Sequence, residues 1–212
     1  MLPTLWPQSN GCSHVKPFSA ARHLITMSKA TEESIHEAWS SHAYDQAFSL
    51  MAQCYASDFY RTALRIVLDH ATAQDVVQEA SVKMWRALPK FKGDSKFSTW
   101  AYRIVVNEAL GTLRKSKNFH RSLDGVDIGV PDSPYFEADR LLADLYRALA
   151  NLPERQRLTF QLRYFDAKPY SDISEILGTS VGGLKANYHH AVERIKREMR
   201  ELNPDYDFES NE

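Results

Sequence analysis

The chain has 212 residues, of which 43% are hydrophobic and 25% are charged, and its formal net charge is −1. This composition is ordinary for a globular protein and excludes a chain that is disordered throughout. Its two cysteines, Cys12 and Cys54, form no CxxC pair, which argues against a disulfide framework or a structural zinc site. No apolar run reaches the roughly 18 to 20 residues of a membrane-spanning helix. We therefore expect no membrane insertion and a cytoplasmic location.

The first 26 residues contain three prolines and no apolar core of the kind that a signal peptide carries. A cleaner helical pattern begins at Met27. We therefore interpret residues 1–26 as a disordered arm or as an extension that depends on which start site is used. The sequence leaves open whether this segment is translated in the native protein.

Hydrophobic residues recur at steps of three and four from Phe48 to Ile66, which predicts one long amphipathic helix. A second helix is expected from about Ala73 to Leu88, where Pro89 stops it. Four of its residues lie on a side other than the apolar face, and they include a tryptophan that the core does not need. These are Asp75, Gln78, Val82 and Trp85.

A third helix is expected to begin near Ser95 or Ser98, either of which can cap it, and to continue to about Lys117. It lies in a basic segment, residues 83–121, with ten Lys or Arg residues and two acids. Exposed aromatic rings in such a segment can stack on unpaired bases, whereas buried rings only pack the core. The residues leave these two readings of Trp100 and Tyr102 equally open. The polar face that these rings adjoin consists of Thr99, Arg103, Asn107 and Arg114, with Lys115 beyond it.

Helical periodicity fails between Asn118 and Asp139, where an acidic stretch contains two glycines and two prolines. Such punctuation is typical of a linker between domains. The periodicity resumes on a helical face with four leucines, and Pro153 fits the first position of the next helix. Those leucines are Leu142, Leu145, Leu149 and Leu152.

A short helix from Ser171 to Leu177, a turn from Gly178 to Ser180, and a basic helix from Val181 to about Leu202 form a helix-turn-helix candidate. The glycine suits a left-handed cap, and the hydroxyls of the turn, those of Thr179 and Ser180, can cap the last helix. The last helix keeps an apolar stripe, and its remaining faces carry donors for base edges and phosphates. The alternative is a solvated outer face, against which the Gly182–Gly183 pair argues, because it lets backbone amides approach phosphates. The candidate DNA-contacting residues are Ser180, Gly182, Gly183, Lys185, Asn187, His189, His190 and Arg194.

Four segments in order resemble one family, the extracytoplasmic-function (ECF) sigma factors of the sigma-70 family, which are bacterial transcription initiation factors. Each motif alone is weak, but the four in this order are specific, and the resemblance spans about Tyr44 to Leu202. The matching segments are DVVQEA at 75–80, FSTWAYRI at 97–104 with Asn107, LPERQR at 152–157, and YSDISEILG at 170–178 leading into SVG at 180–182.

The resemblance implies an all-α protein with two small helical domains joined by a flexible acidic linker, the second domain containing the helix-turn-helix. The implied boundaries are a region 2 domain at 27–117, a linker at 118–139, a region 4 domain at 140–203 and an acidic tail at 204–212. The implied partners are core RNA polymerase, promoter DNA and an anti-sigma protein. No cofactor or metal and no enzymatic activity are expected.

The resemblance also assigns the surfaces. The second helix would dock on the polymerase, the third would recognise and melt the minus-ten element, and the helix-turn-helix would read the minus-35 element. The polymerase-binding residues would be Asp75, Gln78, Glu79, Val82 and Trp85. The minus-ten residues would be Ser98, Thr99, Trp100, Tyr102, Arg103, Asn107, Arg114 and Lys115. The minus-35 residues are the eight candidates of the helix-turn-helix.

The last helix departs from the family, because Gly183, Asn187 and His190 stand where a threonine and arginines are common, which leaves the promoter sequence open. The alternative is a helix-turn-helix transcriptional regulator that is not a sigma factor. It would give Trp100 and the first domain no nucleic-acid role. The sequence does not name the regulon, the inducing signal or the anti-sigma protein, and it does not assign a role to the acidic tail.

Overall fold

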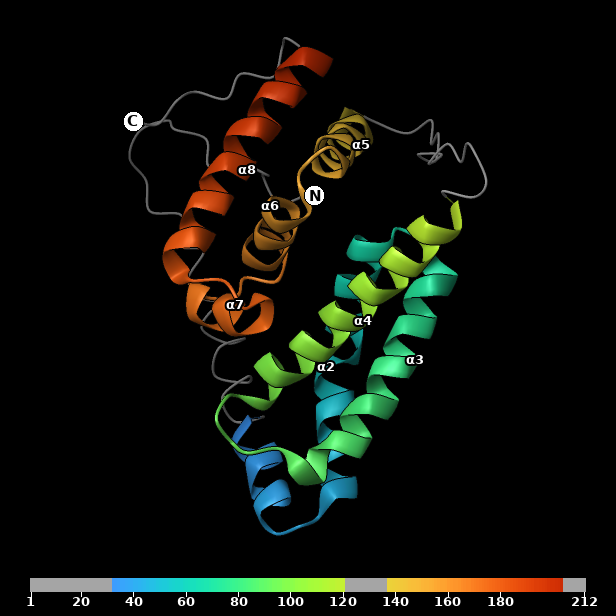
Figure 1. Ribbon diagram of the computed structural model, residues 1–212, viewed down its shortest axis with the longest axis vertical. Helices are drawn as coiled ribbons and strands as arrows, with labels where there is room; N and C mark the ends of the chain where they lie inside the picture. The colour runs from blue at the N-terminus through green and yellow to red at the C-terminus, as the bar shows by residue number, and fades with distance from the viewer. Residues whose placement is uncertain (1–31, 121–136, 204–212) are drawn as a thin grey trace.

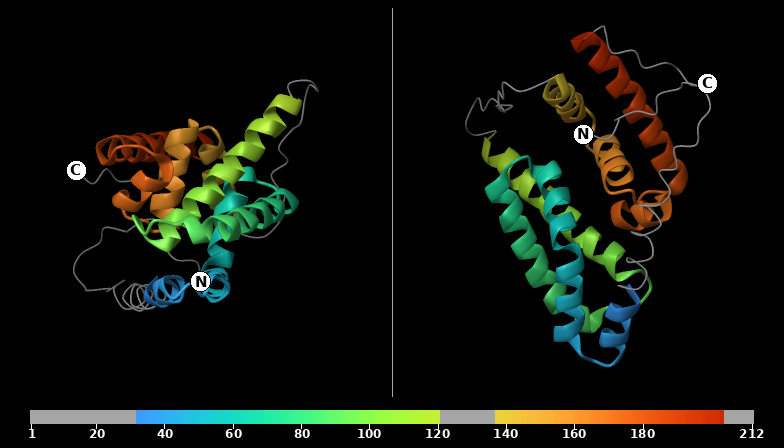
Figure 2. Two further views of the ribbon diagram at one scale, coloured as in Figure 1. Left: turned by 60° about the horizontal axis from the view of Figure 1, so that its bottom comes forward. Right: turned by 180° about the vertical axis from the view of Figure 1, so that it is seen from behind.

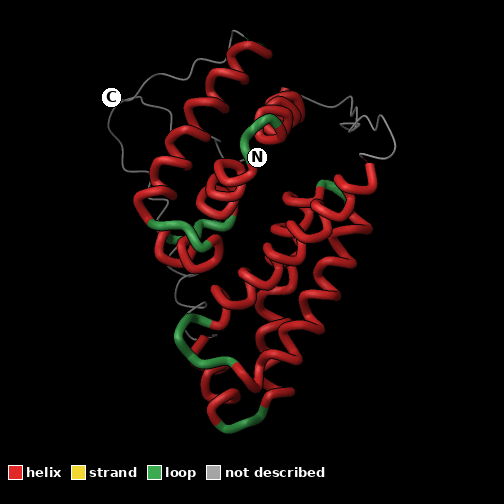
Figure 3. The backbone as a smooth tube through the Cα atoms, viewed as in Figure 1, coloured by secondary structure: helices red, strands yellow, loops and turns green. Residues whose placement is uncertain are grey.

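The computed structural model describes residues 32–120 and 137–203, and places side chains within 32–115 and 144–203. All regular secondary structure in these two stretches is helical, as Figures 1 and 3 show, which confirms the predicted all-α class. The helices form two domains, residues 32–120 and 137–203. The predictions for residues 1–26, for the tail at 204–212 and for the middle of the linker, 121–136, lie outside the described residues. The two ends of the linker predicted at 118–139 lie in described helices.

The first domain begins with a helix at residues 32–40 and continues with α2 (Tyr44–Val67), α3 (His70–Ala87), a short 3₁₀ turn (Leu88–Lys90) and α4 (Phe97–His120). The helices α2, α3 and α4 pack against one another (Figure 1). The apolar stripe predicted for α2 is confirmed, with Tyr55, Phe59 and Ile66 buried in the core.

Helix α3 starts three residues before the predicted position, because Asp69 caps it. The Asp69 carboxylate accepts a hydrogen bond from the Thr72 amide at 2.7 Å. This bond and one from the Thr72 hydroxyl lower the pKa of Asp69. At the other end, Pro89 lies in the 3₁₀ turn that follows the helix, as its missing N–H requires.

The cap predicted for α4 is wrong. Lys96, rather than Ser95 or Ser98, stands directly before the first helical residue, and Ser98 lies buried inside the first turn. The Glu32 carboxylate instead accepts hydrogen bonds from the amides of Phe97 and Ser98, both at 2.9 Å. A residue 65 positions away in the chain therefore satisfies the helix start, which local sequence cannot reveal. The helix also continues to His120, beyond the predicted end near Lys117.

The second domain contains α5 (Glu137–Ala150), α6 (Glu154–Phe160), a π-helical turn (Gln161–Phe165), α7 (Tyr170–Leu177) and α8 (Val181–Leu202). Its own core joins α5, α6 and α8 through a set of buried apolar side chains. These are Leu145, Ala148, Leu149, Leu152, Phe160, Ala191, Ile195 and Met199.

The helix-turn-helix is confirmed as a structural unit. Gly178 ends α7 with φ 62°, the left-handed conformation that favours glycine, and the Ser180 hydroxyl accepts a hydrogen bond from the Gly183 amide at 3.2 Å. Pro153 is one position off the prediction, since it precedes α6 rather than opening it. Helix α5 begins at Glu137, three residues before the predicted start of the region 4 domain at residue 140.

The two domains pack against each other. Helix α7 lies against α4, as the views in Figures 1 and 2 agree. The helices α6, α7 and α8 and the π-helical turn contribute residues to the core of the first domain. The contributed side chains include Leu162 and Ile173, which are fully buried. None of the helices within the two described stretches has both the length and the apolar character needed to cross a membrane.

Candidate functional sites

The α3 surface consists of the five residues predicted to bind polymerase, and the structure brings them together on the outer face of that helix. Asp75, Gln78 and Glu79 are exposed, and the two apolar members remain open as well, with Val82 43% and Trp85 41% exposed. The Trp85 ring packs one side against Phe48 of α2 in an edge-to-face contact, with 5.6 Å between centroids. Trp85 is therefore held in place while much of its surface stays available.

At the start of α4 the aromatic rings are buried, whereas the sequence left exposed and buried rings equally open. Trp100 is 8% exposed and Tyr102 only 2%, and Ser98 and Thr99 are buried with them. Trp100 packs against Phe91 at a centroid distance of 5.2 Å. The packing reading is correct for this arrangement, because two neighbouring faces of α4 are covered, one by the first domain and one by the second.

The contacts of Tyr102 show how the second domain covers α4. One edge-to-face contact joins its ring to Phe59 of α2, with 5.2 Å between centroids. The Lys168 ammonium of the second domain lies 3.9 Å from the centroid of the same ring. Burial raises the pKa of the Tyr102 phenol well above its usual range and lowers the pKa of the Lys168 ammonium.

The other predicted minus-ten residues remain accessible. Arg103, Asn107, Arg114 and Lys115 are exposed along the part of α4 that the second domain leaves open. Arg114 approaches Glu154 of α6 at 3.8 Å, an exposed pair that contributes little to stability. The structure thus divides the eight minus-ten candidates into a buried group at 98–102 and an accessible basic group at 103–115.

Polar contacts between the domains accompany the apolar ones. The Arg65 guanidinium of α2 pairs with Asp166, and the Thr62 hydroxyl donates to the same carboxylate at 3.2 Å. Burial raises the pKa of Asp166 against the opposing effect of Arg65. On the α4 side, Lys96 pairs with Asp172 at 3.1 Å. Sequence reasoning missed these residues, since no local pattern pairs charges that lie 76 to 101 positions apart.

The two glycines at the start of α8 have different surroundings, which give different reasons for the absence of a side chain. A side chain at Gly182 would meet nothing within 4 Å, so the backbone there is open to an approaching phosphate. A Cβ at Gly183 would lie 3.3 Å from both the Ser180 hydroxyl oxygen and a Thr179 methyl group. Gly183 therefore also has a structural role, because the absence of a side chain there protects the helix cap.

The remaining minus-35 candidates lie along α8. Lys185, His189 and His190 are exposed, whereas Asn187 is half-buried. Arg194 is also half-buried, and its guanidinium donates to Glu198 at 3.2 Å. The first three side chains can reach a ligand without rearrangement, and the last two are more constrained than the sequence indicated.

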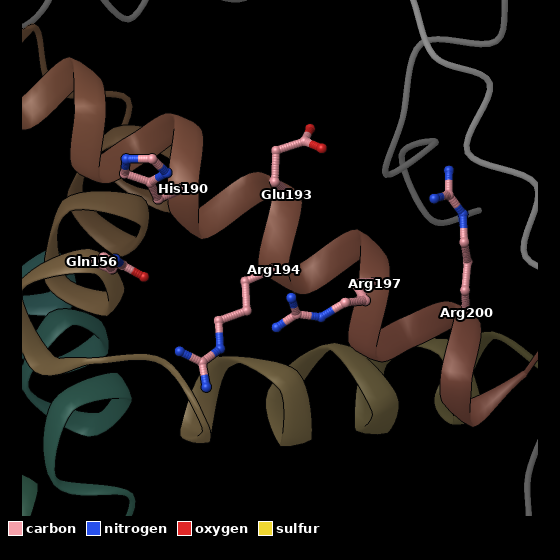
Figure 4. Close-up of a pocket in the computed structure, with 6 residues that line it drawn as sticks. All are labelled: Gln156, His190, Glu193, Arg194, Arg197 and Arg200. Carbon is pink, nitrogen blue, oxygen red and sulfur yellow. The ribbon is translucent and has the colours of Figure 1, made fainter.

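A groove along the second half of α8 was not predicted as a unit. Figure 4 shows its lining, in which Arg194, Arg197 and Arg200 follow His190 along one helix and Gln156 comes from α6. Glu193 is the one acidic side chain in this lining. The spacing of three and four residues from His190 to Arg200 could have identified this basic row, which suits phosphate or carboxylate groups.

Comparison with known proteins identifies both domains. Residues 51–119 match the model for Sigma-70 region 2, and residues 142–195 match the model for Sigma-70, region 4. The chain belongs to the extracytoplasmic-function sigma factors of the sigma-70 family. The first match excludes the alternative of a regulator that shares only the helix-turn-helix, because region 2 is a sigma-factor domain.

Curated relatives cover most of this sigma factor. It is 32% identical to the RNA polymerase sigma-H factor of Pseudomonas aeruginosa over 173 residues, which are 74% of this chain and 88% of the relative. It is 30% identical over 171 residues to the ECF RNA polymerase sigma-E factor of Escherichia coli, with the same two coverages.

Solved structures share the fold. The sigma factor RpoE from Bartonella quintana, in complex with the anti-sigma factor NepR, matches with a TM-score of 0.62 and 25% identity, over 72% of this chain and 96% of that one. CnrH, in complex with the cytosolic domain of CnrY, matches with a TM-score of 0.60 and 20% identity, over 83% and 99% of the two chains.

Proposed function

We propose that this sigma factor binds core RNA polymerase through the α3 surface, recognises and melts the minus-ten element through α4, and reads the minus-35 element through α8. The region 2 domain would comprise residues 27–117, the linker 118–139 and the region 4 domain 140–203. The observation that carries the proposal is the α3 surface, where the apolar side chains of Val82 and Trp85 stay exposed on one helix face together with polar residues.

The α3 surface has the composition of a protein interface. Val82 and Trp85 supply an apolar centre, and Asp75, Gln78 and Glu79 supply polar groups around it. Tryptophan is among the residues that most often dominate binding energy at interfaces. The contact with Phe48 fixes the Trp85 ring before binding, so little side-chain freedom is lost on association.

Minus-ten recognition requires a change from the described arrangement. Arg103, Asn107, Arg114 and Lys115 can contact a DNA strand as they stand, because they are exposed. Stacking on Tyr102 needs an open ring face, so the second domain has to leave α4 before a base can reach this ring. Trp100 packs against Phe91 of its own domain, so stacking on Trp100 also needs a local rearrangement there. We therefore interpret the described arrangement as a closed form of the protein.

Minus-35 recognition would use the start of α8. Ser180 and Gly182 place the helix start near a phosphate, and Lys185 and His189 project from the exposed side of the first turns. A recognition helix typically contacts base edges with its N-terminal residues. His190 and Arg194, together with the basic row that follows them, would contact phosphates rather than bases.

The solved relative in complex with an anti-sigma factor supports a further part of the proposal. We infer that an anti-sigma protein also binds this chain. The protein would act in the cytoplasm, where polymerase and promoters are, and without enzymatic activity of its own.

Reconstituted transcription tests the proposal. Purified full-length protein and core polymerase are expected to give promoter-specific run-off transcripts, and the double variant Gln78→Ala with Trp85→Ala is expected to weaken polymerase binding while the protein stays folded. The matched control is Gln53→Ala, which alters an exposed glutamine on α2, away from the α3 surface. Absence of any promoter-specific transcript from the unaltered protein would contradict the proposal.

A further inference from the structure

We propose that residues 161–172 act as a built-in inhibitor of single-stranded DNA binding, with the Lys168 ammonium occupying the ring face of Tyr102 on which a base would otherwise stack. We call this stretch the closing segment. It consists of the π-helical turn, the loop at 166–169 and the first residues of α7. The inference rests on the proposed minus-ten role of α4, and it concerns how the chain itself regulates that surface.

The first observation is the position of Lys168. Its ammonium lies 3.9 Å from the Tyr102 ring centroid, which is the place a stacked base would need. The Phe59 ring packs against Tyr102 edge to face and belongs to the same domain, so it stays in place when the domains separate. Lys168 belongs to the other domain, and its removal would uncover the ring.

The second observation is that the chain holds Lys168 in this position through its backbone. The Lys168 amide donates to the Leu162 carbonyl at 3.0 Å, and the Arg163 guanidinium donates to the Lys168 carbonyl at 3.0 Å. Ala167 adopts φ 49°, a left-handed conformation that is uncommon for a residue with a side chain. The loop therefore has a defined shape that directs Lys168 to Tyr102.

The third observation is that the closing segment is anchored to the first domain on both sides of Lys168. On one side Asp166 pairs with Arg65, and the Gln161 amide group donates to the Arg65 carbonyl at 3.0 Å. On the other side Asp172 pairs with Lys96 at 3.1 Å. Polar anchors of this kind are typical of domain interfaces that open and close.

The closed arrangement leaves the α3 surface free. Val82 and Trp85 are exposed while Tyr102 is covered, so polymerase could dock on α3 before the closing segment leaves α4. The device would thus keep the unbound protein from engaging single strands, and it would release α4 only when the second domain is drawn away.

The test measures strand binding by variants of the full-length protein. The probe is a 5′-fluorescein-labelled oligonucleotide of thymidines, followed by anisotropy. Lys168→Ala removes the side chain that covers the Tyr102 ring, and it is expected to tighten binding about tenfold or more, because a closed population of about 90% or above lowers the apparent affinity by at least that factor. Tighter strand binding after the loss of a positive charge would distinguish an inhibitory lysine from one that only attracts the strand. Removing a lysine of the second kind would weaken binding.

Lys92→Gln is the matched control, because Lys92 is an exposed lysine of the neighbouring basic loop. It is expected to weaken binding slightly or leave it unchanged. A second set of variants guards against misfolding of the first. Lys96→Glu and Asp172→Lys are each expected to open the protein, and the double charge swap is expected to restore the closed affinity to within about twofold of the unaltered protein.

Hydrogen exchange of the α4 amides at 97–105 provides an independent readout of opening. Faster exchange together with tighter oligonucleotide binding supports the inference. Weaker binding in Lys168→Ala, with exchange unchanged, would overturn it and leave the sigma-factor function intact. Faster exchange with no gain in affinity would instead overturn the proposed minus-ten role of α4, because an opened α4 would then fail to bind the strand.

Discussion

The carboxylate of Glu32 is predicted to be the main stabiliser of the α4 start, and the variant Glu32→Ala tests this. Its two oxygens accept the Phe97 and Ser98 amides at 2.9 Å each, and one oxygen also accepts the Tyr55 hydroxyl at 3.2 Å. The amides at a helix start have no partner within the helix, and a negative charge there also interacts favourably with the helix dipole.

The magnitude follows from these contacts. Losing a helix cap typically costs about 0.5 to 2 kcal/mol, and hydrogen bonds to a charged group are at the upper end of the usual range. We expect Glu32→Ala to lower the free energy of unfolding by about 2 kcal/mol, or the melting temperature by about 4 to 8 °C for a protein of this size. Glu32→Gln keeps one acceptor and is expected to cost about half as much.

Urea denaturation followed by circular dichroism measures the effect, with Glu33→Ala as the control. Glu33 is the exposed neighbour on the same helix, and its replacement is expected to change stability by no more than about 0.5 kcal/mol. Equal losses for the Glu32 and Glu33 variants would refute the reasoning, because the α4 amides would then be satisfied without the carboxylate.

Three further predictions concern the binding surfaces and the buried tyrosine. Trp85→Ala is expected to weaken polymerase binding by about 2 kcal/mol or more, as for a typical interface tryptophan. Its loss of stability should be smaller than that of Met84→Ala, whose buried side chain should cost about 2 to 5 kcal/mol. Polymerase titration measures the binding loss, and urea titration compares the stability of the two variants. Lys185→Ala is expected to lower transcription only from promoters that carry the natural minus-35 element, because losing a base contact costs about 1 to 3 kcal/mol of binding free energy. A uniform loss on all promoters would instead mean that Lys185 contacts phosphates. Because burial raises the pKa of Tyr102, the stability it contributes is fully present below the ordinary tyrosine value of about 10 and is lost as pH rises above it. Tyr102→Phe should therefore resist alkaline unfolding better than the unaltered protein, and unfolding curves above pH 10 that coincide would contradict this.

Local sequence was sufficient for the helices and for the helix-turn-helix. The spacing of apolar residues predicted α2, α3 and α8, and residue types predicted the Gly178 turn and a hydroxyl cap from that turn, which the structure assigns to Ser180. These features depend on neighbours within about one helical turn, which is why sequence alone determines them. The exposed side of α3 was likewise predictable, because helical periodicity assigns residues to faces.

Tertiary structure decided which surfaces are open. Trp100 and Tyr102 adjoin the polar face of α4, yet the closing segment of another domain buries Tyr102. The Arg65–Asp166 pair and the Glu32 cap join residues that are 101 and 65 positions apart, and nothing in their immediate neighbours indicates either contact. Periodicity states which residues share a side of a helix, whereas the element that covers that side depends on how the whole chain packs.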